Sequence, residues 1–182
     1  EESITAYRSS LEIDPKFTPA LFDMGVAYYN IGDFRNAAIA YESVVVAEPK
    51  NYQAHANLAS TYRQMERYSD AVAQYEIASE GIKTAELYSE WGYCLGKMKE
   101  WEASIARLET AREINPAAIE NSNVGWAYYN SGTAKAEAKN DEEAKGDFSK
   151  AKASLETAVQ QDPKLDAAYV NLGSTHNKLG EF

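Results

Sequence analysis

Residues Met24–Pro49, MGVAYYNIGDFRNAAIAYESVVVAEP, contain the pattern that decides the fold. Apolar residues on either side of Gly32 and Asp33 are spaced as on the buried face of a helix. Glycine and aspartate favour turns, and Pro49 ends the second half because it has no N–H to donate. The stretch therefore predicts two short amphipathic helices joined by a tight turn.

The same unit recurs along the chain. Successive first helices carry a small residue that is followed three places later by an aromatic or similar residue. These small residues are Gly25, Ala59, Gly92, Gly125 and Gly173, separated by 34, 33, 33 and 48 residues. The predicted helices lie at about 1–13, 18–31, 34–47, 52–65, 69–80, 85–97, 101–113, 118–131 or longer, 147–160 and 166–179. One such pair cannot bury its apolar face, so neighbouring pairs are expected to stack into an open solenoid.

The order of residue types in the unit is similar to the tetratricopeptide repeat, a helix–turn–helix unit of about 34 residues. The residues that carry the resemblance are Gly25, Tyr28, Gly32, Ala37, Tyr41 and Pro49. The resemblance implies an all-α fold of helix–turn–helix repeats stacked into a right-handed open solenoid. It predicts a single solenoid segment over 1–182. Its repeats are a partial one at 1–17, full ones at 18–51, 52–84, 85–117 and 118–165, and a partial one at 166–182.

One repeat is longer than the others. It contains a 14-residue insert near 133–146, TAKAEAKNDEEAKG, before its second helix. Two extended helices turning at Asn140 and Asp141 would accommodate the insert, and a flexible polar loop between two ordinary helices is the alternative. The hairpin would place Gly132 and Gly146 inside helices and would be a candidate contact element for another protein.

Helix ends are predicted from prolines and from capping residues. Pro15, Pro49, Pro116 and Pro163 are expected to stop second helices. Candidate N-caps are Asp33, Ser69 and Asp147, whose side-chain oxygens can accept a hydrogen bond from the first turn.

Composition bounds the partners. The net charge of −10 argues against nucleic acid, because binding to phosphates needs clustered Lys and Arg. No apolar run is long enough to cross a membrane, so no membrane insertion is expected. Cys94 is the single cysteine, which excludes an internal disulfide. No compartment is determined, although a soluble, cytoplasmic chain is slightly favoured.

No catalytic, metal or cofactor motif is present. The sequence has no GxxxxGK[ST], HExxH or GxSxG. His55 and His176 fall in separate repeats at positions that other units fill with packing residues, so both are expected to pack. We therefore expect no enzyme activity, no catalytic residue, no metal ligand and no cofactor.

In tetratricopeptide repeats the first helices line the concave face. The positions two before the small residue carry Asp23, Asn57, Glu90, Asn123 and Asn171. The three asparagines resemble the asparagine ladder of the repeat arm of O-linked N-acetylglucosamine transferase. An asparagine amide both donates and accepts, so it can pair with a peptide backbone of any sequence. A solvated helix residue is the alternative interpretation.

Aromatic residues occupy neighbouring positions on the same face. Tyr93, Trp126 and Tyr129 are predicted to form a patch that binds an apolar or cationic side chain, or else to pack against the next repeat. No basic residue replaces Phe22, Ala56, Ser89, Ser122 or Val170 at the positions where chaperone-binding repeats hold acidic tails. A bound peptide is therefore expected to be neutral or basic rather than acidic.

The predicted function is a non-enzymatic module that binds an extended segment of a protein partner in its concave groove. Two alternatives stay open from the sequence. One is a scaffold that self-associates through its repeat ends, and the other is a regulatory or substrate-recruiting arm of a larger enzyme.

Overall fold

Helices alternate with short turns at the spacing that the repeats predict. The computed structural model describes residues 2–14 and 16–181, and in these ranges the chain forms helices and no strand. The helices are α1 (Glu2–Ile13), α2 (Thr18–Asn30), α3 (Phe34–Ala47), α4 (Tyr52–Gln64), α5 (Tyr68–Ala78), α6 (Ala85–Lys97), α7 (Trp101–Ile114), α8 (Ala118–Glu137), α9 (Asp141–Gln161) and α10 (Asp166–Leu179). All but α9 agree with the predicted bounds to within two residues, α8 being the longer form that the prediction allowed.

The predicted helix signals are partly confirmed. The Asp33 carboxylate accepts a hydrogen bond from the backbone N–H of Asn36 at 3.2 Å and caps α3. The prediction of a cap at Ser69 is wrong, because α5 already begins at Tyr68. Helices α3, α7 and α9 each end two residues before a proline, whereas the predicted stop at Pro15 lies outside the described residues.

The chain divides into two compact units, Glu1–Lys83 and Thr84–Phe182. In the first unit, Gly25 allows α2 and α3 to approach closely, because a Cβ at Gly25 would lie 2.7 Å from the Tyr41 ring. Tyr41, Leu58 and Tyr75 are buried there. In the second unit the core forms around Leu108 on α7 and Leu155 on α9, with small residues of α8, α9 and α10 packed against them.

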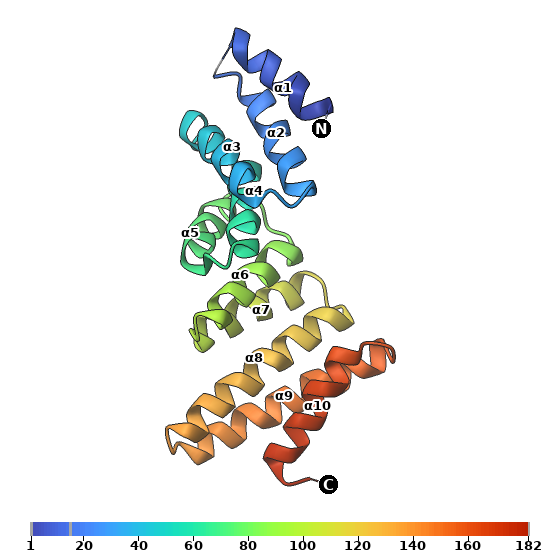
Figure 1. Ribbon diagram of the computed structural model, residues 1–182. Helices are drawn as coiled ribbons and strands as arrows, with labels where there is room; N and C mark the ends of the chain where they lie inside the picture. The colour runs from blue at the N-terminus through green and yellow to red at the C-terminus, as the bar shows by residue number, and fades with distance from the viewer. Residues whose placement is uncertain (1, 15, 182) are drawn as a thin grey trace. The chain divides into compact units, whose positions relative to one another are not determined.

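The 14-residue insert extends two helices. The prediction of a helical hairpin is therefore confirmed, and the alternative of a flexible polar loop is wrong. Helices α8 and α9 lie side by side and turn at residues 138–140 (Figure 1). Gly132 and Gly146 lie inside α8 and α9, as predicted. The prediction that Asp147 caps the second helix is wrong, because α9 begins six residues earlier, at Asp141. Instead the Asp147 carboxylate is buried against α8.

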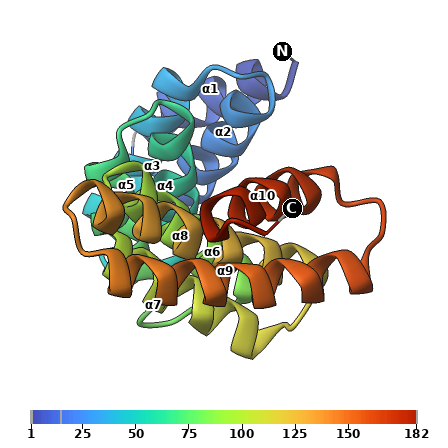
Figure 2. The same cartoon turned by 90° about the horizontal axis from the view of Figure 1, so that it is seen from below.

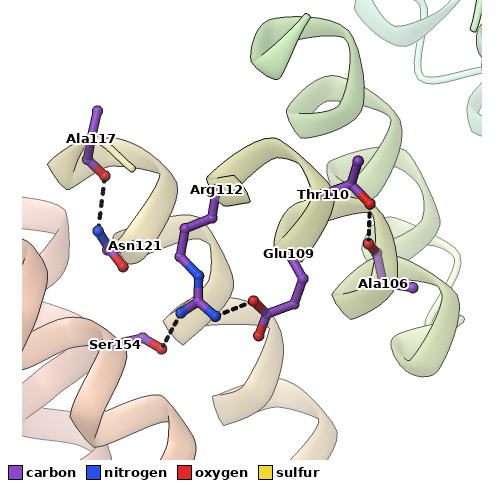
Figure 3. A network of polar contacts seen from close by, with 7 residues as sticks. All are labelled: Ala106, Glu109, Thr110, Arg112, Ala117, Asn121 and Ser154. Carbon is purple, nitrogen blue, oxygen red and sulfur yellow. Dashed lines mark hydrogen bonds and ion pairs between the residues drawn. The ribbon is translucent and has the colours of Figure 1, made fainter. Parts of the chain in front are cut away.

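Polar contacts connect the second helices of this unit. Figure 2 shows α10 beside α9 when the second unit is seen from below. In Figure 3 the Arg112 guanidinium of α7 contacts both the Glu109 carboxylate and the Ser154 hydroxyl of α9, the latter at 3.4 Å. The hydrogen bond from Arg112 to Ser154 connects α7 with α9.

The two histidines differ. His55 is buried, and its ring nitrogens contact Gln74 Oε1 at 2.7 Å and the Pro49 carbonyl at 3.1 Å, so its predicted packing role is confirmed. The same prediction for His176 is wrong. Its side chain is 35% exposed, and its Nδ1 lies 3.0 Å from a carboxylate oxygen of Glu181.

Candidate functional site

The predicted site residues divide between the two units. Asp23 on α2 and Asn57 on α4 belong to the first unit. The second unit contains Glu90 and Tyr93 on α6, Asn123, Trp126 and Tyr129 on α8, and Asn171 on α10.

Asp23 is exposed at the rim of a hollow in the first unit. The hollow is lined by Thr18, Pro19, Phe22, Asp23, Glu48, Asn51 and Gln53. The Thr18 hydroxyl and the Asn51 amide both donate hydrogen bonds to the Glu48 carboxylate. These bonds lower the pKa of the carboxyl group, and the bond from Thr18 has the larger effect. The hollow therefore presents acidic groups.

Asn57 is engaged within its own unit. Its Oδ1 accepts a hydrogen bond from Gln53 Nε2 at 3.0 Å, and its Nδ2 donates to the Tyr41 hydroxyl at 3.4 Å. Each end of the amide has one partner within the unit, which leaves one N–H and one lone pair of the amide for a further contact.

Helices α6 and α8 bring the predicted aromatic residues together. The Tyr93 and Trp126 rings stack with centroids 5.8 Å apart, and the Trp101 and Trp126 rings meet edge-to-face with centroids 5.9 Å apart. Tyr93 is 40% exposed, whereas Trp126 is half-buried. A Cβ at Gly96 would lie 2.4 Å from the Trp126 ring, so this glycine leaves the space that the indole occupies. The stack thus presents one tyrosine on a rigid support.

Polar groups lie one turn before this stack. The Ser89 hydroxyl of α6 donates to Glu120 Oε2 of α8, and Asn123 Nδ2 donates to Ser89 Oγ at 3.2 Å and to Glu120 Oε2 at 3.4 Å. Neither Ser89 nor Glu120 was predicted as a site residue from the sequence. A signal was nevertheless present, because Glu120 stands where the other repeats have Ala20, Ala54, Leu87 and Ala168.

Three predicted residues remain, namely Glu90, which is half-buried on α6, Tyr129 and Asn171. The Tyr129 ring lies 5.9 Å from Phe148 and borders the core around Leu155. Asn171 is half-buried on α10, and its backbone carbonyl accepts a hydrogen bond from the Thr175 hydroxyl at 2.7 Å. Tyr93, Asn123 and Trp126 are gathered at one place, and we call these residues together with Ser89 and Glu120 the α6–α8 face.

Some kinds of site are missing from the described residues. No three His, Cys, Asp or Glu side chains of residues 2–14 and 16–181 are grouped closely enough to hold a metal ion. Over the same ranges, none of the helices combines the length and the apolar character that a membrane span requires.

A tetratricopeptide-repeat family model matches residues 22–81. Tetratricopeptide repeat protein 8 of Caenorhabditis elegans is 24% identical over 184 residues, covering 99% of this chain and 34% of that protein. The chain spans about a third or less of the length of the curated relatives it matches.

Two solved structures share the fold. The MamA protein superposes with a TM-score of 0.77 at 24% identity, over 90% of this chain and 82% of that one. YrrB, described as a TPR protein with an unusual peptide-binding site, also gives a TM-score of 0.77, at 18% identity over 96% of this chain and 84% of that one.

The fold is therefore an all-α repeat solenoid of the kind that serves as a scaffold for protein–protein interaction and is generally non-enzymatic. The family match, the similar structures and the repeated helix pairs agree. The chain has the fold of tetratricopeptide repeat proteins, and its residues 22–81 match the model of that family.

Proposed function

We propose that this chain is a non-enzymatic module that binds an extended segment of a partner protein on the α6–α8 face. The observation that carries the proposal is the stack of Tyr93 on Trp126 beside Asn123. Exposed aromatic residues on a rigid support are the usual anchors of protein interfaces, since they bury much area with little loss of side-chain freedom.

Charge favours a neutral or basic segment over an acidic one or a nucleic acid. Glu86 and Glu90 lie one turn apart on α6, and Glu120 lies across from Ser89 on α8. An acidic peptide or a phosphate backbone would be repelled by these carboxylates and by the net charge of −10. The peptide-binding site named for YrrB supports peptide binding by analogy of fold.

Tyr93→Ala tests the proposal. Binding can be screened with a positional-scanning library of N-acetylated, C-amidated nonapeptides, and then measured by fluorescence anisotropy on the best sequence. We expect Tyr93→Ala to weaken binding about tenfold, because it removes an exposed aromatic anchor. Tyr93 is preferable to Trp126, whose removal would also empty the space above Gly96.

Tyr169→Ala is the matched control. Tyr169 is also an exposed tyrosine on a first helix, 48% exposed, but it lies on α10 away from the stack. Equal losses for Tyr93→Ala and Tyr169→Ala, with helicity retained, would contradict the assignment to the α6–α8 face.

Self-association is a second candidate function. Tyr169 and Val170 of α10 are 48% and 69% exposed, which places two apolar side chains next to each other on one helix. Such a pair favours contact with another protein surface. Sedimentation velocity at increasing concentration tests this, with Val170→Asp expected to abolish any dimer. A monomer at all concentrations would contradict it.

A further inference from the structure

Glu120 is a charged residue at a position that is otherwise apolar. The equivalent residues of the other repeats, Ala20, Ala54, Leu87 and Ala168, are all buried. Glu120 is only 6% exposed, so the larger charged side chain is accommodated in the same layer. Burying a carboxylate without a cation is unfavourable. A requirement of the fold does not explain the residue, since alanine satisfies that layer elsewhere.

The hydrogen bonds of Glu120 leave one of its oxygens open. Both described donors, Ser89 Oγ and Asn123 Nδ2, reach Oε2. Oε1 accepts no hydrogen bond from the described residues, and it is not among their fully buried, unpartnered polar atoms, so it keeps some contact with solvent.

The same contacts determine which atoms the cluster presents. A carboxylate can only accept, so the Asn123 amide must turn its Nδ2 toward Glu120 and Ser89. Asn123 Oδ1 takes part in neither of these hydrogen bonds and is a second acceptor. The Ser89 hydroxyl has already donated its hydrogen to Glu120. The cluster therefore offers acceptors, and a ligand that satisfies it has to bring N–H groups.

The charge of Glu120 is only partly compensated. Its place in the first turn of α8 is favourable, since the helix N-terminus carries a partial positive charge. No cationic side chain among the described residues pairs with it. Lys97, the basic residue nearest the stack on α6, lies with its Nζ 5.9 Å from the Tyr93 ring. The Lys97 cation disfavours the binding of a second cation over the Tyr93 ring. A basic group of a ligand is therefore expected beside Glu120 and not beside Tyr93.

We propose that the open carboxylate oxygen of Glu120, together with Asn123 Oδ1, receives the side chain of an arginine or lysine in the bound segment. This inference rests on the proposed function and specifies its ligand. Ser89 and Tyr93 are one turn apart on α6, a rise of about 6 Å, which an extended chain spans in about two residues. The segment accordingly carries an apolar or aromatic side chain for Tyr93 two residues from the basic one.

A double-mutant cycle with the nonapeptide library described above tests the proposal. The wild-type protein is expected to select Arg or Lys at one position and an apolar residue two positions away. Replacing that Arg with citrulline, which is neutral and nearly the same shape, should weaken binding to wild type about tenfold. The same replacement should change binding to Glu120→Gln less than twofold, because the charge partner is already gone.

Glu120→Ala is the folding control, since alanine is native at three equivalent positions. The variant should melt at or above the wild-type temperature. It should nevertheless lose the preference for peptides with a basic residue. Tyr93→Ala separates the two proposals. If peptides bind and depend on Tyr93 but show no basic preference, or if citrulline weakens binding to wild type and Glu120→Gln equally, the role of Glu120 is wrong and the peptide-binding function stands. If no library peptide binds the wild-type protein, both are wrong.

Discussion

Gly96 sets the position of the Trp126 ring and therefore the shape of the α6–α8 face. Its missing side chain leaves space for the indole, which contacts the rings of both Tyr93 and Trp101. The adjacent carboxylate of Glu120 is held by Ser89 and Asn123. At this scale the face consists of a few side chains whose positions depend on each other.

Gly96→Ala should displace the Trp126 ring and destabilise the protein. A Cβ at 2.4 Å from the indole requires the ring to move, at a cost of about 1–3 kcal/mol. Urea unfolding and tryptophan fluorescence measure the two effects. Gly146→Ala is the matched control, because nothing lies within 4 Å of its Cβ and an exposed helix alanine should stabilise by about 0.5–1 kcal/mol. Equal effects of the two substitutions would contradict the role of Gly96.

Tyr41 should make stability fall at alkaline pH. Burial raises the pKa of Tyr41 to about 12, from an ordinary value of 10.0, against a smaller lowering effect from the Asn57 hydrogen bond. A raised folded-state pKa means that the folded protein retains the proton while the unfolded chain loses it. The contribution is complete below about pH 10 and is lost between pH 10 and 12.

Comparison with Tyr41→Phe isolates this effect. Between pH 8 and pH 11 the wild-type protein should lose about 1 kcal/mol more unfolding free energy than the variant. The pKa of Tyr62 is also raised to about 12, but Tyr62 is present in both proteins and cancels in the difference. Parallel pH profiles would show that Tyr41 does not titrate as described.

At the scale of elements, hydrogen bonds of the buried Asp147 side chain join the two helices of the α8–α9 hairpin, and we call this group of contacts the polar lock. The buried Asp147 carboxylate of α9 accepts hydrogen bonds from the Ser131 hydroxyl at 2.7 Å and from Lys135 Nζ at 2.8 Å, both on α8. The hydrogen bond from Lys135 to Asp147 raises the pKa of the lysine. These bonds join the two helices where the insert extends them beyond the ordinary repeat.

Asp147→Ala should loosen this hairpin. Loss of the carboxylate leaves Ser131 without its acceptor and Lys135 without its counter-ion, with an expected destabilisation of about 1–3 kcal/mol. The value is below that of a fully buried pair because the Lys135 side chain is 25% exposed and can reach water. Hydrogen exchange of residues 131–146 should accelerate. Glu142→Ala, an exposed acidic residue on the same helix, should change stability by less than about 0.5 kcal/mol. If it matches Asp147→Ala, the lock does not exist.

At the scale of the whole molecule, each unit has its own core. The stability of repeat proteins is approximately a sum over repeats and their nearest neighbours. Leu155 contacts α8, α9 and α10 through a core that belongs to the second unit alone. A defect there should therefore remain within that unit.

Leu155→Ala should lower hydrogen-exchange protection in α8, α9 and α10 and leave α2–α5 unchanged. The cavity is expected to cost about 2–5 kcal/mol, because Leu155 is fully buried. Exchange followed by mass spectrometry resolves the helices. Val46→Ala, at an exposed site on α3, is the control and should have little effect. Equal loss of protection in Thr18–Ala78 would show that the two units unfold together.

The repeat pattern alone determined most helices of this protein and their pairing. Gly25, Ala37 and Tyr41 alternate small and large residues at helical spacing, and that local pattern is enough to specify a helix pair and its neighbour. The insert was also recognisable, because its flanks align with the opening unit. The right-handed sense and the single continuous segment over 1–182 stay predictions.

The tertiary structure decided which side chains meet. Asp147 was predicted to cap a helix, but it lies inside α9, where its buried carboxylate meets Ser131 and Lys135 of α8. The α6–α8 face needs Ser89, Gly96, Glu120 and Trp126, which come from two helices more than 20 residues apart along the chain. Only folding sets the distances between them, so the open oxygen of Glu120 could not be read from the sequence.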